Sequence, residues 1–266
     1  MLVKSTEFIK ICHRKLVATV TINRPEALNS INYDMWLELT NILDLLDQDL
    51  QTRCIIITGA GEKAFCAGAD IAEFKDFRSD SEKGKSYNNR VDCLLNTIRH
   101  LNTPIIAMVN GIAAGGGCEI SVAADLRIGS TNSKLGIPVA KLGITIGHAE
   151  MKSLVELVGR GTAMYILLTG RLLNADEALK SGLLNHVVDQ SVLVSFTNAI
   201  AEEIADLAPL SHAGNKQTMN HISEISSLNE LNEQQKMLPL AQFDTADYQE
   251  GFNAFLEKRK PSFEGK

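Results

Sequence analysis

A glycine run followed by one glutamate is the part of this sequence best suited to chemistry. The run Gly115 to Gly117 precedes an apolar segment, residues 118–124, that can form a helix, and Glu119 falls in its first turn. Backbone amides at such a helix start, with Gly116 carrying no Cβ, can donate to an oxygen that bears negative charge. Glu119 either stabilises the helix end or acts as a general acid or base beside an oxyanion hole. Its apolar neighbours favour the second interpretation.

A second tight segment, residues 65–70, contains Ala67, Gly68, Ala69 and Asp70 and follows a strand-like run at 55–57. Small side chains let a ligand approach the backbone closely, although a simple packing turn has the same composition. The two segments together predict a site built from backbone amides and one carboxylate.

The cysteines give a weaker signal. There are five, an odd number, with no C-x-x-C pair, which indicates a reducing compartment and a cytoplasmic location. Cys66 and Cys118 lie beside the two glycine-rich turns, so a nucleophilic thiol is an alternative. Small buried cysteines are commoner, and we expect both to be packing residues.

These segments need a scaffold of strands and helices. Two β-branched runs, 8–12 and 16–23, suit a hairpin, and residues 33–50 have helical periodicity. The runs 54–58 and 104–109 end at glycine turns and indicate short buried strands. Strands that alternate with helices predict stacked βα units and an α/β fold.

The second half of the chain is mostly helical in pattern. The polar segment Arg78 to Tyr87 is predicted to be a mobile surface loop. After Gly170 only Val187 and Val188 suit a strand. Four helices are expected there, over 175–180, 191–207, 211–222 and 228–255. We therefore divide the chain into a mixed core, residues 1–200, and a helical piece, residues 201–266.

Composition excludes several functions. The 266 residues carry a net charge of −6 and the pI is about 5.6, so no overall field attracts nucleic acid or an anionic membrane. The longest apolar stretch, 105–124, contains Asn110, Glu119 and four glycines and does not suit a membrane span. No metal-binding or nucleotide-binding motif is recognised, and we expect no metal and no redox cofactor.

The chain resembles the crotonase, or enoyl-CoA hydratase/isomerase, family from end to end. Several separate motifs occur in the family's order and spacing. They are NRPEALNSIN at 23–32, KAFCAGADI at 63–71, TPIIAMVNGIAAGGGCEI at 103–120, AADLRI at 123–128, LTGRLLNADEALKSGLLNHVV at 168–188 and QEGFNAFLEKRKPSF at 249–263.

The resemblance implies a crotonase-like spiral of ββα units followed by a C-terminal helical trimerisation region, assembled as a homotrimer or a dimer of trimers. It implies an acyl-CoA thioester as the ligand, with coenzyme A as part of the substrate and no separate cofactor. By motif position, the amides of Ala69 and Gly116 would form the oxyanion hole. The remaining implied CoA-binding positions are Ala27, Leu28, Lys63, Ala67, Gly68, Asp70, Ile71, Gly115, Phe255 and Lys258, the last two from this or a neighbouring subunit.

One position departs from the family pattern. Family hydratases carry a second glutamate 20 residues after the first, in a G-x-P-E turn, but here that turn ends in Val139, which cannot transfer a proton. His148 and Glu150, in a nearby segment that faces the substrate in many hydratases, are candidates for the missing group. Alternatively, both cap or coat the helix that follows them.

The expected function is acyl-CoA processing, with an oxyanion hole and Glu119 as the proton-transfer residue. Enoyl-CoA hydratase activity, a carbon–oxygen lyase reaction, is the first choice. Because Val139 replaces the second glutamate, an enoyl-CoA isomerase or an acyl-CoA hydrolase or decarboxylase of the same family is an alternative. A non-catalytic acyl-CoA binder has less support, because a pure binder has little need of Glu119.

Overall fold

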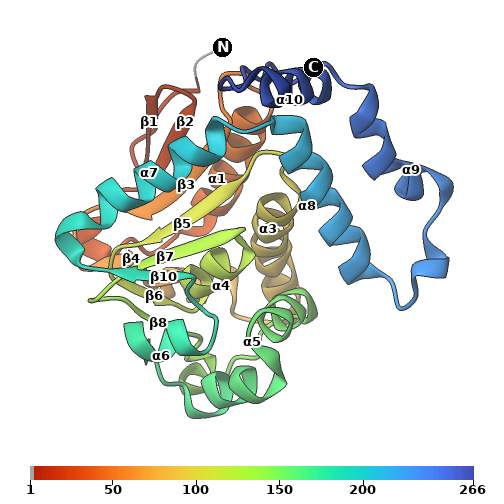
Figure 1. Ribbon diagram of the computed structural model, residues 1–266. Helices are drawn as coiled ribbons and strands as arrows, with labels where there is room; N and C mark the ends of the chain where they lie inside the picture. Colours follow the sequence, from red (N-terminus) through yellow and green to blue (C-terminus); the bar gives the residue numbers. More distant parts are fainter. Residues whose placement is uncertain (1–2) are drawn as a thin grey trace.

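The computed structural model describes residues 3–266, which form two β-sheets surrounded by helices (Figure 1). The larger sheet has the order β1-β2-β3-β5-β7-β10 and the smaller has the order β4-β6-β8-β9. Only the β1–β2 and β8–β9 pairs are antiparallel in these two sheets of the described chain. The strands are β1 (Ile9–Arg14), β2 (Val17–Ile22), β3 (Cys54–Gly59), β4 (Ala64–Cys66), β5 (Ile105–Val109), β6 (Ile112–Ala114), β7 (Leu126–Ser130), β8 (Lys134–Gly136), β9 (Leu173–Asn174) and β10 (His186–Val188).

The chain winds between the sheets in repeated turns. Strands β3, β5 and β7 lie in the larger sheet, and each is followed at once by a strand of the smaller sheet, β4, β6 or β8. One or more helices follow each pair of strands. This repeat confirms the predicted α/β spiral of ββα units.

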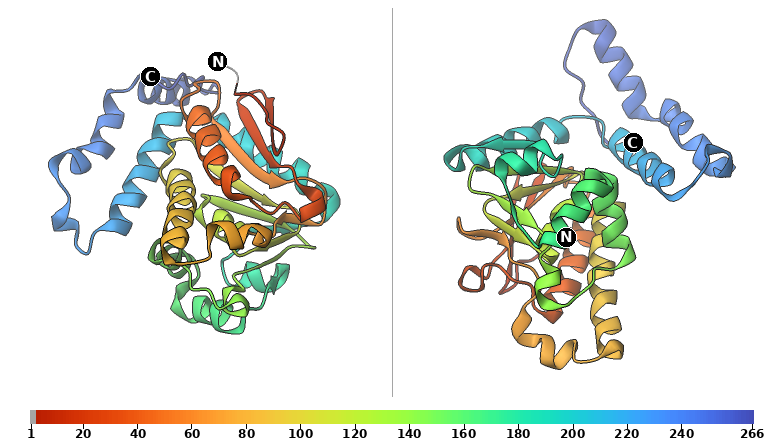
Figure 2. Two further views of the ribbon diagram at one scale, coloured as in Figure 1. Left: turned by 180° about the vertical axis from the view of Figure 1, so that it is seen from behind. Right: turned by 90° about the horizontal axis from the view of Figure 1, so that it is seen from below.

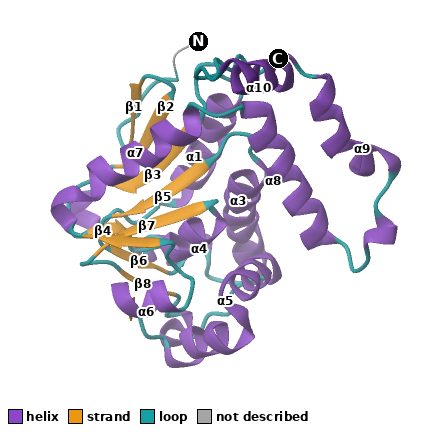
Figure 3. Ribbon diagram, viewed as in Figure 1, coloured by secondary structure: helices purple, strands orange, loops and turns teal. Residues whose placement is uncertain are grey.

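Helices cover both sheets, as Figure 3 shows. Helices α1 and α3 pack against each other, and α7 packs against β3, β5 and β7. The short helix α4 contacts β4 and β6, so its first turn lies beside the smaller sheet. The helices are α1 (Tyr33–Asp47), α2 (Phe74–Phe77), α3 (Ser81–His100), α4 (Gly116–Ala123), α5 (His148–Thr169), α6 (Ala175–Lys180), α7 (Leu193–Ala205), α8 (Pro209–Glu224), α9 (Glu233–Ala241) and α10 (Ala246–Glu257).

The hydrophobic core explains why these helices form. Buried side chains of α1, including Trp36 and Leu43, and of α3, including Leu94 and Ile98, belong to one large cluster with the inner faces of the strands. Helix α1 begins at Asn32, whose side chain accepts from the Met35 amide at 2.9 Å, an ordinary N-cap. Burial of one helix face, rather than intrinsic propensity, supplies most of the stability of such helices.

The predicted mobile loop at Arg78 to Tyr87 is wrong for most of its length, because α3 begins at Ser81. The Asp80 side chain caps this helix by accepting from the Lys83 amide at 2.9 Å. Tyr87, Val91 and Leu94 follow at helical spacing and are buried. The charged residues of its first two turns face solvent, and its apolar face begins only at Tyr87. The sequence pattern therefore did not indicate a helix start at Ser81.

The single helix predicted over 228–255 is also wrong, since the structure divides the segment. A 3-10 turn (Leu228–Glu230) precedes α9, and another (Gln242–Asp244) separates α9 from α10. Asn232 and Thr245 provide new N-caps for α9 and α10, which explains the breaks. Strand β9 is a further difference, because Val187 and Val188 had been the only strand residues expected after Gly170.

Helices α8, α9 and α10 form the C-terminal part of the chain, and the right-hand view in Figure 2 shows α9 reaching away from the sheets. Helix α7 lies against the larger sheet, so it belongs with the preceding elements in space. The boundary near residue 200 is close to this change, but its role as a domain division stays a prediction. Within residues 3–266, no helix has the length and apolar character needed to cross a membrane.

Candidate active site

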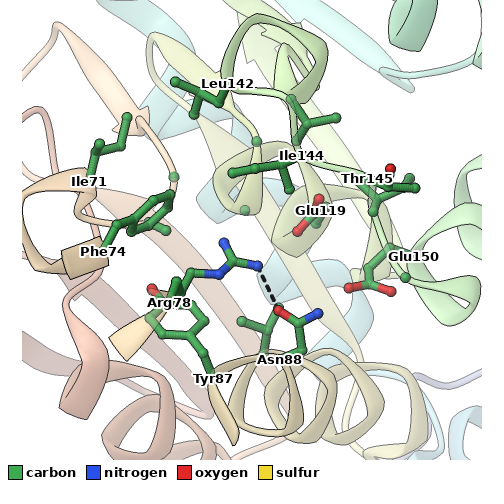
Figure 4. A pocket seen from close by; sticks show the side chains of 18 of the residues that line it. Ile71, Phe74, Arg78, Tyr87, Asn88, Glu119, Leu142, Ile144, Thr145 and Glu150 are labelled. Carbon is green, nitrogen blue, oxygen red and sulfur yellow. Dashed lines mark hydrogen bonds between the residues drawn. The ribbon is translucent and has the colours of Figure 1, made fainter. Parts of the chain in front are cut away.

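A cavity of about 140 Å³ lies beside the start of α4, bounded by α2, α3 and the segment that leads into α5 (Figure 4). Its walls are mainly apolar, with a few polar groups directed inward, as is usual for small-molecule sites. The lining residues are Trp36, Ala67, Gly68, Ala69, Ile71, Phe74, Arg78, Tyr87, Asn88, Val91, Gly115, Gly116, Glu119, Pro138, Val139, Leu142, Ile144, Thr145, Ile146, Gly147 and Glu150.

Gly116 forms part of one wall of the cavity. Gly116 is the first residue of α4, so its N–H has no partner inside the helix. The preceding Gly115 has φ 51° and ψ −123°, a conformation that favours glycine. A Cβ added at Gly116 would lie 2.7 Å from Cη2 of Trp36, so a side chain at this position would collide with the indole. The amide is therefore accessible because both positions are glycine.

The amide nitrogen of Ala69 lies close to Gly116. A Cβ built on Gly116 would lie 3.8 Å from the Ala69 nitrogen, so the two residues are close together. Ile31 holds this turn, since its N–H donates to the Gly68 carbonyl at 2.8 Å and its carbonyl accepts from the Asp70 amide at 2.9 Å. Among the hydrogen bonds of residues 3–266, the Ala69 N–H donates to none. Ala69 and Gly116 both line the cavity, and their role as a pair of oxyanion donors stays a prediction.

Glu119 lies in the first turn of α4 and lines the same cavity. Its side chain is half-buried. Burial raises the pKa of Glu119 to about 8, with a further increase from the nearby Glu150 carboxyl, while Arg78 acts in the opposite direction. A carboxyl with a pKa near 8 can both donate and accept a proton close to neutral pH.

Glu150 provides a second carboxyl from a different element. It lies in the first turn of α5, is 8% exposed and points into the cavity near Glu119 (Figure 4). Burial raises its pKa, although the amide N–H groups of the helix start partly oppose this. A Cβ on Gly147 would lie 2.5 Å from Oε2 of Glu150, so a glycine there gives the carboxyl its space.

The structure separates the two candidates for the missing acid. Val139 lines the cavity as an apolar wall, and Glu150 lines it with a carboxyl. His148 is exposed and does not line the cavity, so the geometry does not bring it to this site. The alternative in which a residue only coats α5 fits His148, whereas the Glu150 carboxyl lies both at the helix start and in the cavity.

Several of the implied CoA-binding positions line the cavity or adjoin a residue that lines it. The Ala67 amide donates to the Leu28 carbonyl at 3.0 Å, so the segment Ala27–Leu28 adjoins the turn that carries Ala69. Ile71 and Gly115 line the cavity themselves. Their binding of CoA stays a prediction.

Other implied positions lie apart from the cavity. Lys63 is exposed and precedes β4, while Phe255 and Lys258 lie at the end of α10. Phe255 is 83% exposed, and neither it nor Lys258 lines the cavity of its own chain. Their implied contact with CoA stays a prediction.

Asp70 has a structural partner. Its carboxylate accepts from Arg24 at 3.0 Å and caps the following 3-10 turn through the Ala72 amide at 3.2 Å. Arg24 also donates to the Ser30 carbonyl at 2.9 Å. Asp70 therefore joins the segment of Arg24 to the turn that carries Ala69, and its carboxylate is occupied within the protein.

Cys66 and Cys118 are both fully buried. Burial raises the pKa of each thiol to about 12. A thiolate, the reactive form, is therefore strongly disfavoured at neutral pH, which supports the packing interpretation.

Sequence reasoning missed two polar groups of the cavity, Arg78 and Tyr87. Both lie in the segment that the sequence predicted to be a mobile surface loop. The helical spacing of Tyr87, Val91 and Leu94, with Asp80 as an N-cap, was the available signal. Tyr87 accepts from Nε1 of Trp36 at 2.9 Å and thus fixes the indole beneath Gly116.

The two amides and two carboxyls define a class of site that can stabilise an oxyanion and transfer protons beside it. The family model described as enoyl-CoA hydratase/isomerase matches residues 13–266. The chain belongs to the enoyl-CoA hydratase/isomerase family.

Individual relatives agree with this assignment. The chain is 38% identical over 244 residues to a short-chain-enoyl-CoA hydratase of Clostridium acetobutylicum, covering 92% of each protein. It is 36% identical over 247 residues to a crotonyl-CoA hydratase of Syntrophomonas wolfei, covering 93% of this chain and 94% of the relative. An enoyl-CoA hydratase/carnithine racemase structure from Magnetospirillum magneticum superposes with a TM-score of 0.94 at 33% identity, over 99% of this chain and 98% of that one.

Proposed function

We propose that the protein is an enoyl-CoA hydratase, a lyase that adds water across the C2=C3 bond of a 2-enoyl-CoA thioester. The observation that carries the proposal is the placement of Glu119 and Glu150 in one cavity with the free amides of Ala69 and Gly116. The names of two relatives, short-chain-enoyl-CoA hydratase and crotonyl-CoA hydratase, support the same reaction.

In this mechanism the amides of Ala69 and Gly116 donate to the thioester oxygen. The oxygen of a water molecule forms a bond to C3, and the π electrons move through C2 onto the thioester oxygen, giving an enolate. Preorganised donors stabilise that charge, and loss of one such donor typically costs about 3 to 4 kcal/mol. The enolate then collapses as C2 takes a proton, which leaves a 3-hydroxyacyl thioester.

The carboxyls of Glu119 and Glu150 transfer the protons. Neighbouring carboxylates disfavour simultaneous ionisation, so the pair holds one proton in its active form. The ionised member accepts a proton from water and the protonated member supplies one to C2. Glu150 thereby takes the part that the second glutamate has in the family pattern, from α5 instead of the turn that ends in Val139.

An isomerase is the second candidate, because Glu119 lies beside the amides and could move one proton between C2 and C4 without Glu150. Hydration of crotonyl-CoA by the wild type, Glu119→Gln and Glu150→Gln separates the two. The hydratase predicts turnover that falls at least 100-fold in each variant. Glu203→Gln, an exposed carboxyl on α7, is the matched control.

The outcomes are distinct. Absence of hydration in the wild type, with conversion of a 3-enoyl-CoA that depends on Glu119 alone, would replace the hydratase by the isomerase. Binding of acyl-CoA without turnover of either substrate would favour the non-catalytic binder.

Assembly as a homotrimer or a dimer of trimers is part of the same proposal. Exposed apolar side chains gather on the C-terminal helices, an arrangement typical of a surface that associates. They include Met219, Ile222, Met237, Leu240, Phe243, Phe252, Phe255 and Leu256. Sedimentation equilibrium of the full chain would show a trimeric or hexameric mass, and a monomeric mass would remove this part of the proposal.

A further inference from the structure

An arginine enters the cavity described above from the side opposite Ile144 and Thr145. Arg78 follows α2 as its C-terminal cap residue, is half-buried and directs its guanidinium toward the interior of the cavity (Figure 4). It is the single lysine or arginine among the described residues that line this space. A cation among apolar walls is costly to bury unless a partner or ligand compensates it.

The protein holds this side chain firmly but without an ion pair. The guanidinium carbon lies 4.6 Å from the ring centroid of Tyr87 and 5.0 Å from that of Phe74. Nη2 donates to Oδ1 of Asn88 at 2.6 Å. Arg78 takes part in none of the ion pairs found within residues 3–266. The Arg78 side chain is thus held by aromatic and amide contacts, and several N–H donors of its guanidinium remain available.

A role as counter-ion for the two glutamates explains these observations less well. Arg78 lowers the pKa of Glu119 and Glu150, but burial is the larger effect at both, and the pKa of Glu119 still lies at about 8. Glu119 is therefore mainly neutral at pH 7. Glu150 can then carry the single negative charge of the pair, but within residues 3–266 neither glutamate forms an ion pair with Arg78, so its guanidinium keeps donors for an anionic ligand.

We propose that the preferred substrate is a short acyl-CoA whose acyl chain ends in a carboxylate, and that Arg78 binds this carboxylate through its guanidinium fork. The inference rests on the proposed function, because it takes the cavity as the acyl pocket. The thioester oxygen would lie at the amides of Ala69 and Gly116, and the chain would extend past Glu119 toward Arg78. Planar carboxylate and guanidinium groups suit this pairing, which arginine forms better than lysine.

Binding of two unreactive ligands tests the inference. Glutaryl-CoA and pentanoyl-CoA have acyl chains of the same carbon number, and they differ in having a carboxylate or a methyl group at the end. Neither contains a double bond, so calorimetry measures their affinity whether or not the protein is a hydratase. We expect the wild type to bind glutaryl-CoA at least 30-fold more tightly than pentanoyl-CoA.

Variants at Arg78 test whether this residue causes the preference for glutaryl-CoA over pentanoyl-CoA. Arg78→Met retains an unbranched side chain without charge, and it should reduce glutaryl-CoA affinity about 100-fold while pentanoyl-CoA affinity changes less than threefold. Arg78→Lys should recover part of the loss. Arg160→Gln, an exposed arginine on α5 that does not line the cavity, is the control and should leave both affinities unchanged.

Equal affinity of the wild type for the two ligands, or an equal loss of both in Arg78→Met, would overturn the inference and leave Arg78 as a packing residue. Turnover measurements distinguish failure of the Arg78 inference from failure of the proposed hydratase function. Hydration of 2-pentenoyl-CoA with no preference for glutaconyl-CoA would refute the substrate class alone. The glutaryl-CoA preference without hydration of either enoyl thioester would refute the hydratase and leave the carboxylate site established.

Discussion

Glu119 and Glu150 face one cavity from the first turns of two different helices, α4 and α5. Both carboxyls lie near positive helix ends, yet burial raises the pKa of each. The helix starts favour ionisation and the apolar walls oppose it, with burial the stronger effect. A pair arranged in this way can hold a single proton at neutral pH.

The pH dependence of hydration should follow this pair. Because the pKa of Glu119 is about 8, the proton needed by C2 is lost as the pH rises through that value, and kcat/KM should fall tenfold per pH unit above it. Glu150→Gln removes a neighbour that raises this pKa, so its residual activity should begin to fall at a lower pH. Stopped-flow absorbance of crotonyl-CoA between pH 5 and 10 provides the measurement, and a constant kcat/KM across pH 7 to 10 would contradict the assignment.

Glu119→Gln should make the protein more stable while it removes activity. The native pKa of Glu119 is raised, so ionisation disfavours the folded state, and wild-type stability from this group decreases as the pH rises from about 4.5 toward 8. The amide has no charge to bury. We expect a gain on the order of 2 kcal/mol at pH 8 and almost none at pH 4. Urea unfolding at the two pH values measures it, and an equal change at both would show that the effect is not ionisation.

A glutamate at Val139 should replace the carboxyl of Glu150. Both residues line the cavity, from the turn after β8 and from α5. The double variant Val139→Glu with Glu150→Gln should therefore regain at least 10-fold of the hydration lost in Glu150→Gln alone. Val139→Gln in the same background is the uncharged control. No recovery in the double variant, despite intact folding by circular dichroism, would argue against a role for Glu150 in proton transfer.

Gly116→Ala should reduce turnover and stability together. The added methyl would lie 2.7 Å from the Trp36 ring, so the turn must shift and its amide would leave the position beside Ala69. We expect kcat to fall about 100-fold, as for loss of one oxyanion donor. Gly84→Ala is the control, since a Cβ there meets no atom within 4 Å and α3 should gain up to about 1 kcal/mol. An active Gly116→Ala protein would remove this amide from the mechanism.

Local patterns predicted much of the scaffold, for physical reasons. The buried strands around Ile56 and Ala107 are short apolar runs that end at glycine turns, and α1 has one continuous apolar face. Helix α3, which carries Tyr87, was missed because its exposed first turns are highly polar. Its apolar side becomes visible only where it packs on α1.

The sequence by itself determined the backbone part of the site. Gly115 and Gly116 are required where a helix starts against Trp36, and such requirements are local enough to be read from residue types. Only the tertiary structure decided which side chains meet those amides. Glu150 and Arg78 reach the cavity because α5 and α2 pack around it, and burial there sets the protonation of Glu119. Long-range packing, which no spacing along the chain encodes, selects these partners and their charge states.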